Sequence, residues 1–139
     1  MSERVLVDTG PLVAVLSRND LHHKACVEQL RELAPPLLTC WPVITEAAWL
    51  LRHYPAAIER LLVSFDAGLL RLLPLEEQAV SWIGRFLRRY RKLGAQVADA
   101  ALVYLAEQEG IETIFTLDRR DFSVYRLSRN RSLHLLPPV

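Results

Sequence analysis

The sequence predicts an α/β fold in which helices cover both faces of a central, mainly parallel sheet. Short apolar segments that resemble buried strands alternate with longer segments whose apolar residues recur at helical spacing. Prolines stand at the expected starts of several helices, and glycines stand at several expected ends. Because strands that alternate with helices form βαβ units, we expect the strands to run parallel to one another.

Three strands and four helices are expected in the first half of the chain. A strand at residues 4–8 is followed by a short helix that Pro11 is suited to begin. The second helix starts near Asn19 or Asp20, either of which is a suitable N-cap, and stops at Pro35. The remaining elements are a strand at 37–40, a helix at 42–54, a helix at 56–68 and a strand at 69–73.

Two helices and two strands are expected in the second half. A long amphipathic helix at residues 75–92 begins with two acids, Glu76 and Glu77, and ends in basic residues, which suits the helix dipole at both ends. Gly94 follows this helix, and Gly110 ends a further helix at 96–110. The expected strands lie at residues 112–117 and 132–137.

Length and composition indicate a single globular domain over residues 1–139. Hydrophobic residues make up 51% of the chain and charged residues 24%, which is enough apolar material for one core. The apolar runs are shorter than the ~20 residues of a transmembrane helix, and the N-terminus does not have the pattern of a signal peptide. Cys26 and Cys40 have the spacing of neither a metal site nor a disulfide framework, so we expect a reducing compartment, the cytoplasm.

Basic residues are concentrated in two stretches of a chain whose net charge is only +1. Residues 85–92 contain five basic side chains and no acid, and residues 119–131 contain five arginines and one acid. Arginine is suited to bidentate contacts with phosphate, although solvated helix faces have a similar composition. The candidate phosphate contacts are Arg85, Arg88, Arg89, Arg119 and Arg120.

Two aspartates stand at or just after the ends of expected strands. Asp8 ends the strand at 4–8, where Thr9 and Gly10 allow a tight turn into a helix. Asp118 follows the strand at 112–117. In open α/β sheets, functional groups gather beyond the carboxyl ends of the strands, so both carboxylates are expected at that edge.

Two further acids lie on the apolar faces of expected helices. Asp99 has apolar residues three, four and seven positions after it, and Glu46 has them three and four positions after it. Both acids are expected near the N-termini of their helices, where free N–H groups favour an anion. Stabilisation of a helix end is therefore a sufficient explanation for either acid taken alone.

The four acids together favour a metal site. Two carboxylates ~5 Å apart repel by about 3 kcal/mol at an effective dielectric constant near 20. No lysine adjoins any of the four to offset this repulsion. Sets of carboxylate oxygens suit hard divalent cations such as Mg²⁺ or Mn²⁺, which can activate water and stabilise the charge on a phosphodiester. If these acids converge, the sequence predicts metal-assisted phosphodiester hydrolysis by Asp8, Glu46, Asp99 and Asp118.

Four segments of the chain resemble the PIN domain, the nuclease fold of the VapC ribonuclease toxins. They are VLVDTGPLVAVL, the glutamate in PVITEAAWLL, VADAALVYLAEQEG and IFTLDRRDF, and together they span nearly the whole chain. The resemblance implies a PIN-like three-layer α/β/α sandwich with a parallel sheet, an acidic Mg²⁺ or Mn²⁺ pocket and RNA endonuclease activity. By position, it makes the four acids named above the catalytic and metal-binding residues.

The resemblance also implies supporting residues and partners. Thr116 matches a hydroxyl residue that supports the first acid, Thr9 adjoins that acid, and Asp121 orients the loop or contributes to the metal site. The arginines would hold the RNA backbone. The chain is then expected to be the toxin of a VapBC-type toxin–antitoxin pair, with RNA as substrate, a cognate antitoxin protein, no membrane association and a homodimeric state.

Two other functions are weighed against this one. A non-catalytic PIN-like module that binds nucleic acid would have no need of four carboxylates that repel one another. A phosphatase or another small α/β hydrolase is a third possibility, but the second acid of a haloacid-dehalogenase-type phosphatase would stand at Gly10. The three tryptophans, Trp41, Trp49 and Trp82, are expected in the core or at a dimer interface.

Overall fold

A five-stranded parallel sheet forms the centre of the computed structural model, which describes residues 3–138. The strands follow the order β3-β2-β1-β4-β7, and each neighbouring pair is parallel, as the sequence predicts. The expected domain also contains residues 1, 2 and 139, which lie outside the described residues. The strands are β1 (Val5–Val7), β2 (Leu37–Thr39), β3 (Leu70–Leu72), β4 (Thr113–Phe115) and β7 (His134–Leu136).

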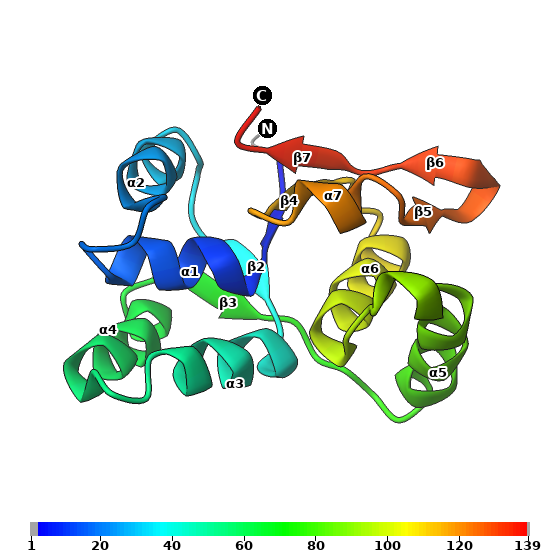
Figure 1. Ribbon diagram of the computed structural model, residues 1–139, viewed down its shortest axis with the longest axis horizontal. Coiled ribbons are helices and arrows are strands. Elements are labelled where there is room, and N and C mark those ends of the chain that lie inside the picture. Colours follow the sequence, from blue (N-terminus) through cyan, green and yellow to red (C-terminus); the bar gives the residue numbers. More distant parts are fainter. Residues whose placement is uncertain (1–2, 139) are drawn as a thin grey trace.

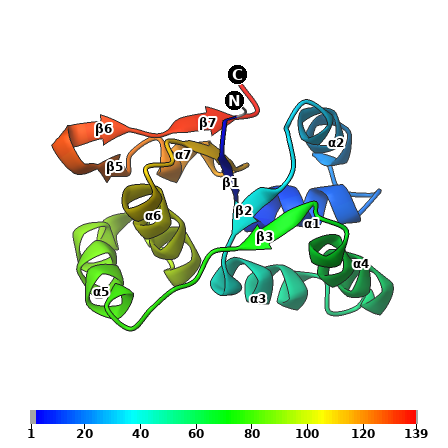
Figure 2. The ribbon, with the colours of Figure 1, turned by 180° about the vertical axis from the view of Figure 1, so that it is seen from behind.

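Helices cover both faces of the sheet, which confirms the predicted three-layer α/β/α arrangement. α1, α2 and α4 lie on one side of the strands, and α5 and α6 lie on the other (Figures 1 and 2). Within residues 3–138, no helix is both long and apolar enough to cross a membrane. The α-helices are α1 (Thr9–Leu16), α2 (His23–Arg31), α3 (Trp41–Leu50), α4 (Pro55–Asp66), α5 (Ala79–Arg89), α6 (Val97–Glu109) and α7 (Arg119–Phe122).

The core is built from strands that are buried on both faces. All three residues of β1 are buried, as are those of β2 and β4, which is typical of parallel strands between two helical layers. α6 is almost equally apolar, since Ala98 and every residue from 100 to 106 are buried. Asp99 is the single acid inside this stretch. α6 therefore places the carboxylate of Asp99 at the edge of the hydrophobic core.

Two expected helices begin later than their sequence patterns predict. α2 starts at His23 instead of Asn19 or Asp20, because the Asp20 carboxylate accepts a hydrogen bond from the His22 backbone N–H (2.8 Å) and stabilises a turn. α5 starts at Ala79, so Glu76 and Glu77 precede the helix and its first turn contains no acid. The basic end of α5 matches the prediction, with Arg88 and Arg89 in its last turn.

The segment between β4 and β7 contains structure that the sequence pattern did not predict. After the short helix α7, the strands β5 (Arg126–Leu127) and β6 (Arg131–Ser132) form an antiparallel hairpin around the 3₁₀ turn η2 (Ser128–Asn130). A second 3₁₀ turn, η1 (Arg91–Leu93), follows α5. Two-residue strands are too short to show a period of alternation, which is why the hairpin escapes sequence analysis.

The three tryptophans occupy different environments. Trp82 is half-buried and packs against Phe86 and Tyr104, with ring centroids 5.5 and 5.3 Å away. Trp41 and Trp49 are 61% and 63% exposed, so they do not lie in the core, and their expected place at a dimer interface stays a prediction. They stand at the two ends of α3, on a face that no other described element covers fully.

Candidate metal centre

Asp8 lies at the carboxyl end of β1 and is fixed through both of its carboxylate oxygens. Its backbone N–H donates to the Phe115 carbonyl (2.9 Å), which extends the ladder between β1 and β4. Its Oδ1 accepts from the Thr9 backbone N–H (2.8 Å) and caps α1, while its Oδ2 accepts from the Thr116 hydroxyl (2.7 Å). The side chain is 7% exposed. The strand therefore ends in a buried and oriented carboxylate.

The buried position of Asp8 makes its negative charge costly. Burial, together with the nearby carboxylates of Asp99 and Glu46, raises the pKa of Asp8 to about 7. The hydrogen bonds from Thr116 and Thr9 act in the opposite direction. The two charged residues that act on the pKa of Asp8, namely Asp99 and Glu46, are both acids.

Asp118 and Asp121 lie on the connection from β4 into α7. The Thr116 hydroxyl, which donates to Asp8, also accepts from the Asp118 backbone N–H (3.0 Å) and so joins the two strand ends. Asp118 Oδ1 accepts from the Asp121 backbone N–H (3.1 Å) and caps α7. The pKa of Asp121 is raised by desolvation and by Asp118, whereas Arg120 lowers it.

Asp99 approaches the same place from the first turn of α6. Its Oδ2 accepts a hydrogen bond from the Tyr125 hydroxyl (2.8 Å). Burial, together with the carboxylates of Asp118 and Glu46, raises the pKa of Asp99 to about 6, although the Tyr125 hydrogen bond acts in the opposite direction. As at Asp8, the charged neighbours of Asp99 are all acids.

Three of these carboxylates lie close enough to hold one ion. One oxygen each from Asp99, Asp118 and Asp121 lies within 4.8 Å of the other two. Such a set contains only oxygen donors and carries a high negative charge, which fits a hard divalent cation such as Mg²⁺ or Mn²⁺. We call these three residues the acidic triad. Asp121, which the sequence suggested for either the loop or the metal, thus joins two of the four acids predicted to bind metal.

Glu46 lies beside the acidic triad but outside it. It is the sixth residue of α3, whose first turn holds no acid, so the expected place near the helix N-terminus is wrong. The reason is that Cys40 caps the helix and Pro42 stands in its first turn, which places Glu46 beyond the free N–H groups. Glu46 instead lines a shallow groove between α3 and the start of α6, together with Trp41, Trp49 and Val97.

The candidate phosphate contacts differ in how free their side chains are. Arg85, Arg88 and Arg89 are exposed on α5, and none of them belongs to the ion pairs found among residues 3–138. Arg120 is exposed as well, whereas Arg119 is half-buried and donates to the Pro137 carbonyl (2.6 Å). The most accessible basic surface is therefore that of α5.

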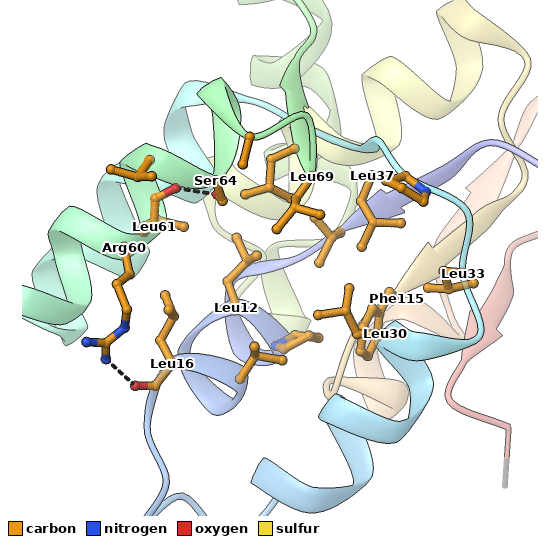
Figure 3. A pocket seen from close by; sticks show the side chains of 17 residues that line it. Leu12, Leu16, Leu30, Leu33, Leu37, Arg60, Leu61, Ser64, Leu69 and Phe115 are labelled. Carbon is orange, nitrogen blue, oxygen red and sulfur yellow. Dashed lines mark hydrogen bonds between the residues drawn. The ribbon is translucent and has the colours of Figure 1, made fainter.

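A separate cavity of about 400 Å³ lies between the sheet and the helices α1, α2 and α4 (Figure 3). Its walls are apolar and contain no acid, and Arg60 at its edge donates to the Leu16 carbonyl (3.5 Å). This cavity has no groups for acid, base or metal chemistry. The residues labelled in its wall include Leu12, Leu30, Leu37, Leu61, Leu69 and Phe115.

Comparisons with known proteins agree with this fold. A family model described as the PIN domain matches residues 5–127. The curated protein Ribonuclease VapC26 of Mycobacterium tuberculosis (strain ATCC 25618 / H37Rv) is 28% identical over 124 residues, which cover 88% of this chain and 92% of that protein. The crystal structure of Mycobacterium tuberculosis VapC20, described as a sarcin-ricin loop cleaving toxin, superposes with a TM-score of 0.74 at 18% identity, covering 83% of this chain and 90% of that one.

Proposed function

The chain belongs to the PIN domain family, and on this basis we propose that it is a metal-dependent endoribonuclease that hydrolyses RNA phosphodiester bonds. The observation that carries the proposal is the acidic triad, in which one carboxylate oxygen of each residue lies within 4.8 Å of the other two. The curated relative named as a ribonuclease, which this chain matches over most of its length, supports RNA as the substrate.

The acidic residues of the site bind the metal ion, and two threonines orient one of them. Asp8, Glu46, Asp99 and Asp118 hold Mg²⁺ or Mn²⁺ directly or through water, and Asp121 joins them because its carboxylate lies beside those of Asp99 and Asp118. When bound, the ion supplies positive charge next to the phosphodiester and makes water a better nucleophile. Thr116 and Thr9 keep Asp8 oriented through its two oxygens.

Two alternatives have less support. In a module that only binds RNA, five carboxylates would repel the phosphates that the arginines attract, so keeping them would weaken binding. In a phosphatase of the haloacid-dehalogenase type, a second acid would stand at position 10. Any side chain there would meet Leu117 at 3.3 Å, which is a tight contact.

The experiment that tests the proposed function is a digestion of several RNAs, including transfer and ribosomal RNA. With Mn²⁺ present, the purified chain is expected to cut RNA internally. Excess EDTA is expected to stop the cutting, because without the ion the negative charge of the site would repel the phosphodiester and its bound water would not be acidified. Cleavage that persists unchanged in EDTA would contradict metal dependence. Binding without cleavage across a whole-transcriptome digest would favour the binding module instead.

We propose that the exposed arginines of α5 hold the RNA backbone, with Arg119 and Arg120 as further contacts. Each phosphate contact releases counterions, so replacing Arg88 and Arg89 by alanine should flatten the dependence of log affinity on log salt by about one unit per lost contact. The matched control replaces Arg4 and Arg131, which are exposed but ion-paired with Glu109, Glu107 and Glu112. Equal slopes for the two double variants would place the α5 arginines away from RNA.

We further propose that the chain is the toxin of a VapBC-type pair, in the cytoplasm, with a cognate antitoxin protein. The VapC relatives support this assignment, and two free buried cysteines, Cys26 and Cys40, suit a reducing compartment. The exposed Trp41 and Trp49 support a homodimer through α3. A solution mass that stays monomeric at micromolar concentration would contradict the dimer.

A further inference from the structure

Tyr125 connects the core of the protein to the acidic triad. The tyrosine is fully buried, and its hydroxyl donates to Asp99 Oδ2 at 2.8 Å, although the two residues are 26 positions apart in the sequence. It stands between α7 and β5, in the segment whose structure the sequence pattern does not predict. Buried tyrosine hydroxyls require a partner, and here the partner is a carboxylate of the candidate metal centre.

The ring of Tyr125 is held from three directions. Its centroid lies 4.9 Å from that of Phe86, 4.9 Å from that of Tyr90 and 5.0 Å from that of Phe122, with the ring planes tilted or perpendicular. Phe86 belongs to α5, Tyr90 follows it, and Phe122 belongs to α7. Because a packed ring has little freedom to turn, the hydroxyl points at Asp99 in a fixed direction.

The orientation of Asp99 needs such support. Asp118 and Glu46 repel its carboxylate, and a free aspartate in the first turn of a helix would turn toward solvent under that repulsion. A carboxylate is planar, so a hydrogen bond that fixes Oδ2 also fixes the direction of Oδ1. Outer groups that orient metal ligands in this way commonly determine how tightly the metal binds.

We propose that Tyr125 is a positioning residue that holds the carboxylate of Asp99 in place for the metal ion. This inference rests on the proposed function, since it assigns Tyr125 a role toward the same metal. Tyr125 touches neither the RNA nor the ion; it acts through Asp99. Tyr125 is itself held by an aromatic cluster, whose other members are Phe86, Tyr90 and Phe122. Packing in this cluster therefore limits the movement of the hydroxyl that binds Asp99.

Tyr90 provides a matched control within the same cluster. It is also buried, at 8% exposure, and its ring lies against Tyr125. Its hydroxyl, however, accepts from the Arg126 backbone N–H (3.1 Å) and contacts no acid. Tyr90→Phe and Tyr125→Phe therefore remove the same atom from the same packing environment, and only the second removes a hydrogen bond to the metal site.

The experiment measures Mn²⁺ affinity by calorimetry without RNA, and kcat and KM for RNA cleavage. Tyr125→Phe is expected to weaken Mn²⁺ binding and to lower kcat, each about tenfold, with KM for RNA unchanged because the arginines are intact. Tyr90→Phe is expected to leave Mn²⁺ affinity and kcat as in the wild type. Melting temperatures of both metal-free variants verify that they fold.

The possible outcomes separate this inference from the proposed function. If the wild type binds Mn²⁺ and cuts RNA while Tyr125→Phe does both equally well, Tyr125 has no positioning role. Equal losses in Tyr90→Phe and Tyr125→Phe would assign the effect to packing and would overturn the inference in the same way. A wild type that binds no Mn²⁺ would overturn the metal-dependent function, and the role of Tyr125 with it.

Discussion

Replacing Asp99 with asparagine is expected to abolish RNA cleavage while leaving the metal-free protein as stable as the wild type or more stable. Loss of one carboxylate from the acidic triad should lower the rate at least about 100-fold, which corresponds to roughly 2.7 kcal/mol in the barrier. Stability should not fall, because burial and neighbouring acids raise the pKa of Asp99 to about 6 and so make its charge unfavourable near neutral pH. The asparagine oxygen can still accept from the Tyr125 hydroxyl.

The matched control is Asp66→Asn, the same chemical change at an exposed acid at the end of α4. Cleavage by this control should equal that of the wild type, while Asp99→Asn should show a Tm that is unchanged or a few degrees higher in EDTA. A large fall in Tm for Asp99→Asn would make Asp99 a structural residue of the α6 N-terminus. Cleavage that persists in Asp99→Asn would indicate a contaminating nuclease.

The parts of this fold that the sequence predicts well are those with a strong pattern. The central strands β2, β1 and β4 are short, mainly apolar runs, and their burial on both faces accounts for this composition. α6 is predicted because its apolar residues continue for almost three turns and because Gly110, which ends it in the left-handed conformation, is a typical C-terminal residue. Asp8 is predictable for a related reason, since it directly follows a buried strand and functional groups in open α/β sheets gather at the carboxyl ends of the strands.

The parts that the sequence does not predict depend on contacts between distant segments. Asp121 enters the acidic triad because the short helix α7 turns it back beside Asp99 and Asp118, and a four-residue helix leaves no periodic signal. In the sequence, Tyr125 has no feature that distinguishes it from other core residues. Its hydrogen bond to Asp99 depends on the folding of two distant segments against each other. Glu46 shows the opposite case, because its helix is predicted from the sequence. The helix begins at Trp41, one residue before the predicted start, and Glu46 lies beyond its first turn.

Thr116 illustrates how one small side chain organises the site. Its hydroxyl donates to Asp8 Oδ2 and accepts from the Asp118 backbone N–H, so it links the first and last strand-end acids across neighbouring strands. This is possible because Val7 pairs with Phe115, which places Asp8 and Thr116 at equivalent positions beyond β1 and β4. A parallel register thus converts two distant sequence segments into one site.

The free energy of unfolding of the metal-free protein is expected to fall as pH rises from about 4 to about 7, in the contribution that Asp8 makes. Burial and the neighbouring acids raise the pKa of Asp8 to about 7, above its ordinary value of 3.8. The folded state therefore keeps a proton that the unfolded chain has released, and folding becomes less favourable as pH rises through this window. The full effect is on the order of 4 kcal/mol, since each pKa unit corresponds to about 1.4 kcal/mol.

Asp8→Asn isolates this contribution from the other titrating groups. Asparagine also caps helices well, and its amide can donate to the Thr116 hydroxyl in place of accepting from it, so the variant should fold. Urea denaturation in EDTA should show the variant close to the wild type at about pH 4.5 and clearly more stable at about pH 7.5. Mn²⁺ added at the higher pH should stabilise the wild type and not the variant, because only the wild type offers the ion the complete set of acids. A stability difference that stays constant over this pH range would mean that Asp8 is ionised at no cost in the folded protein, and the case for a cation beside it would fail.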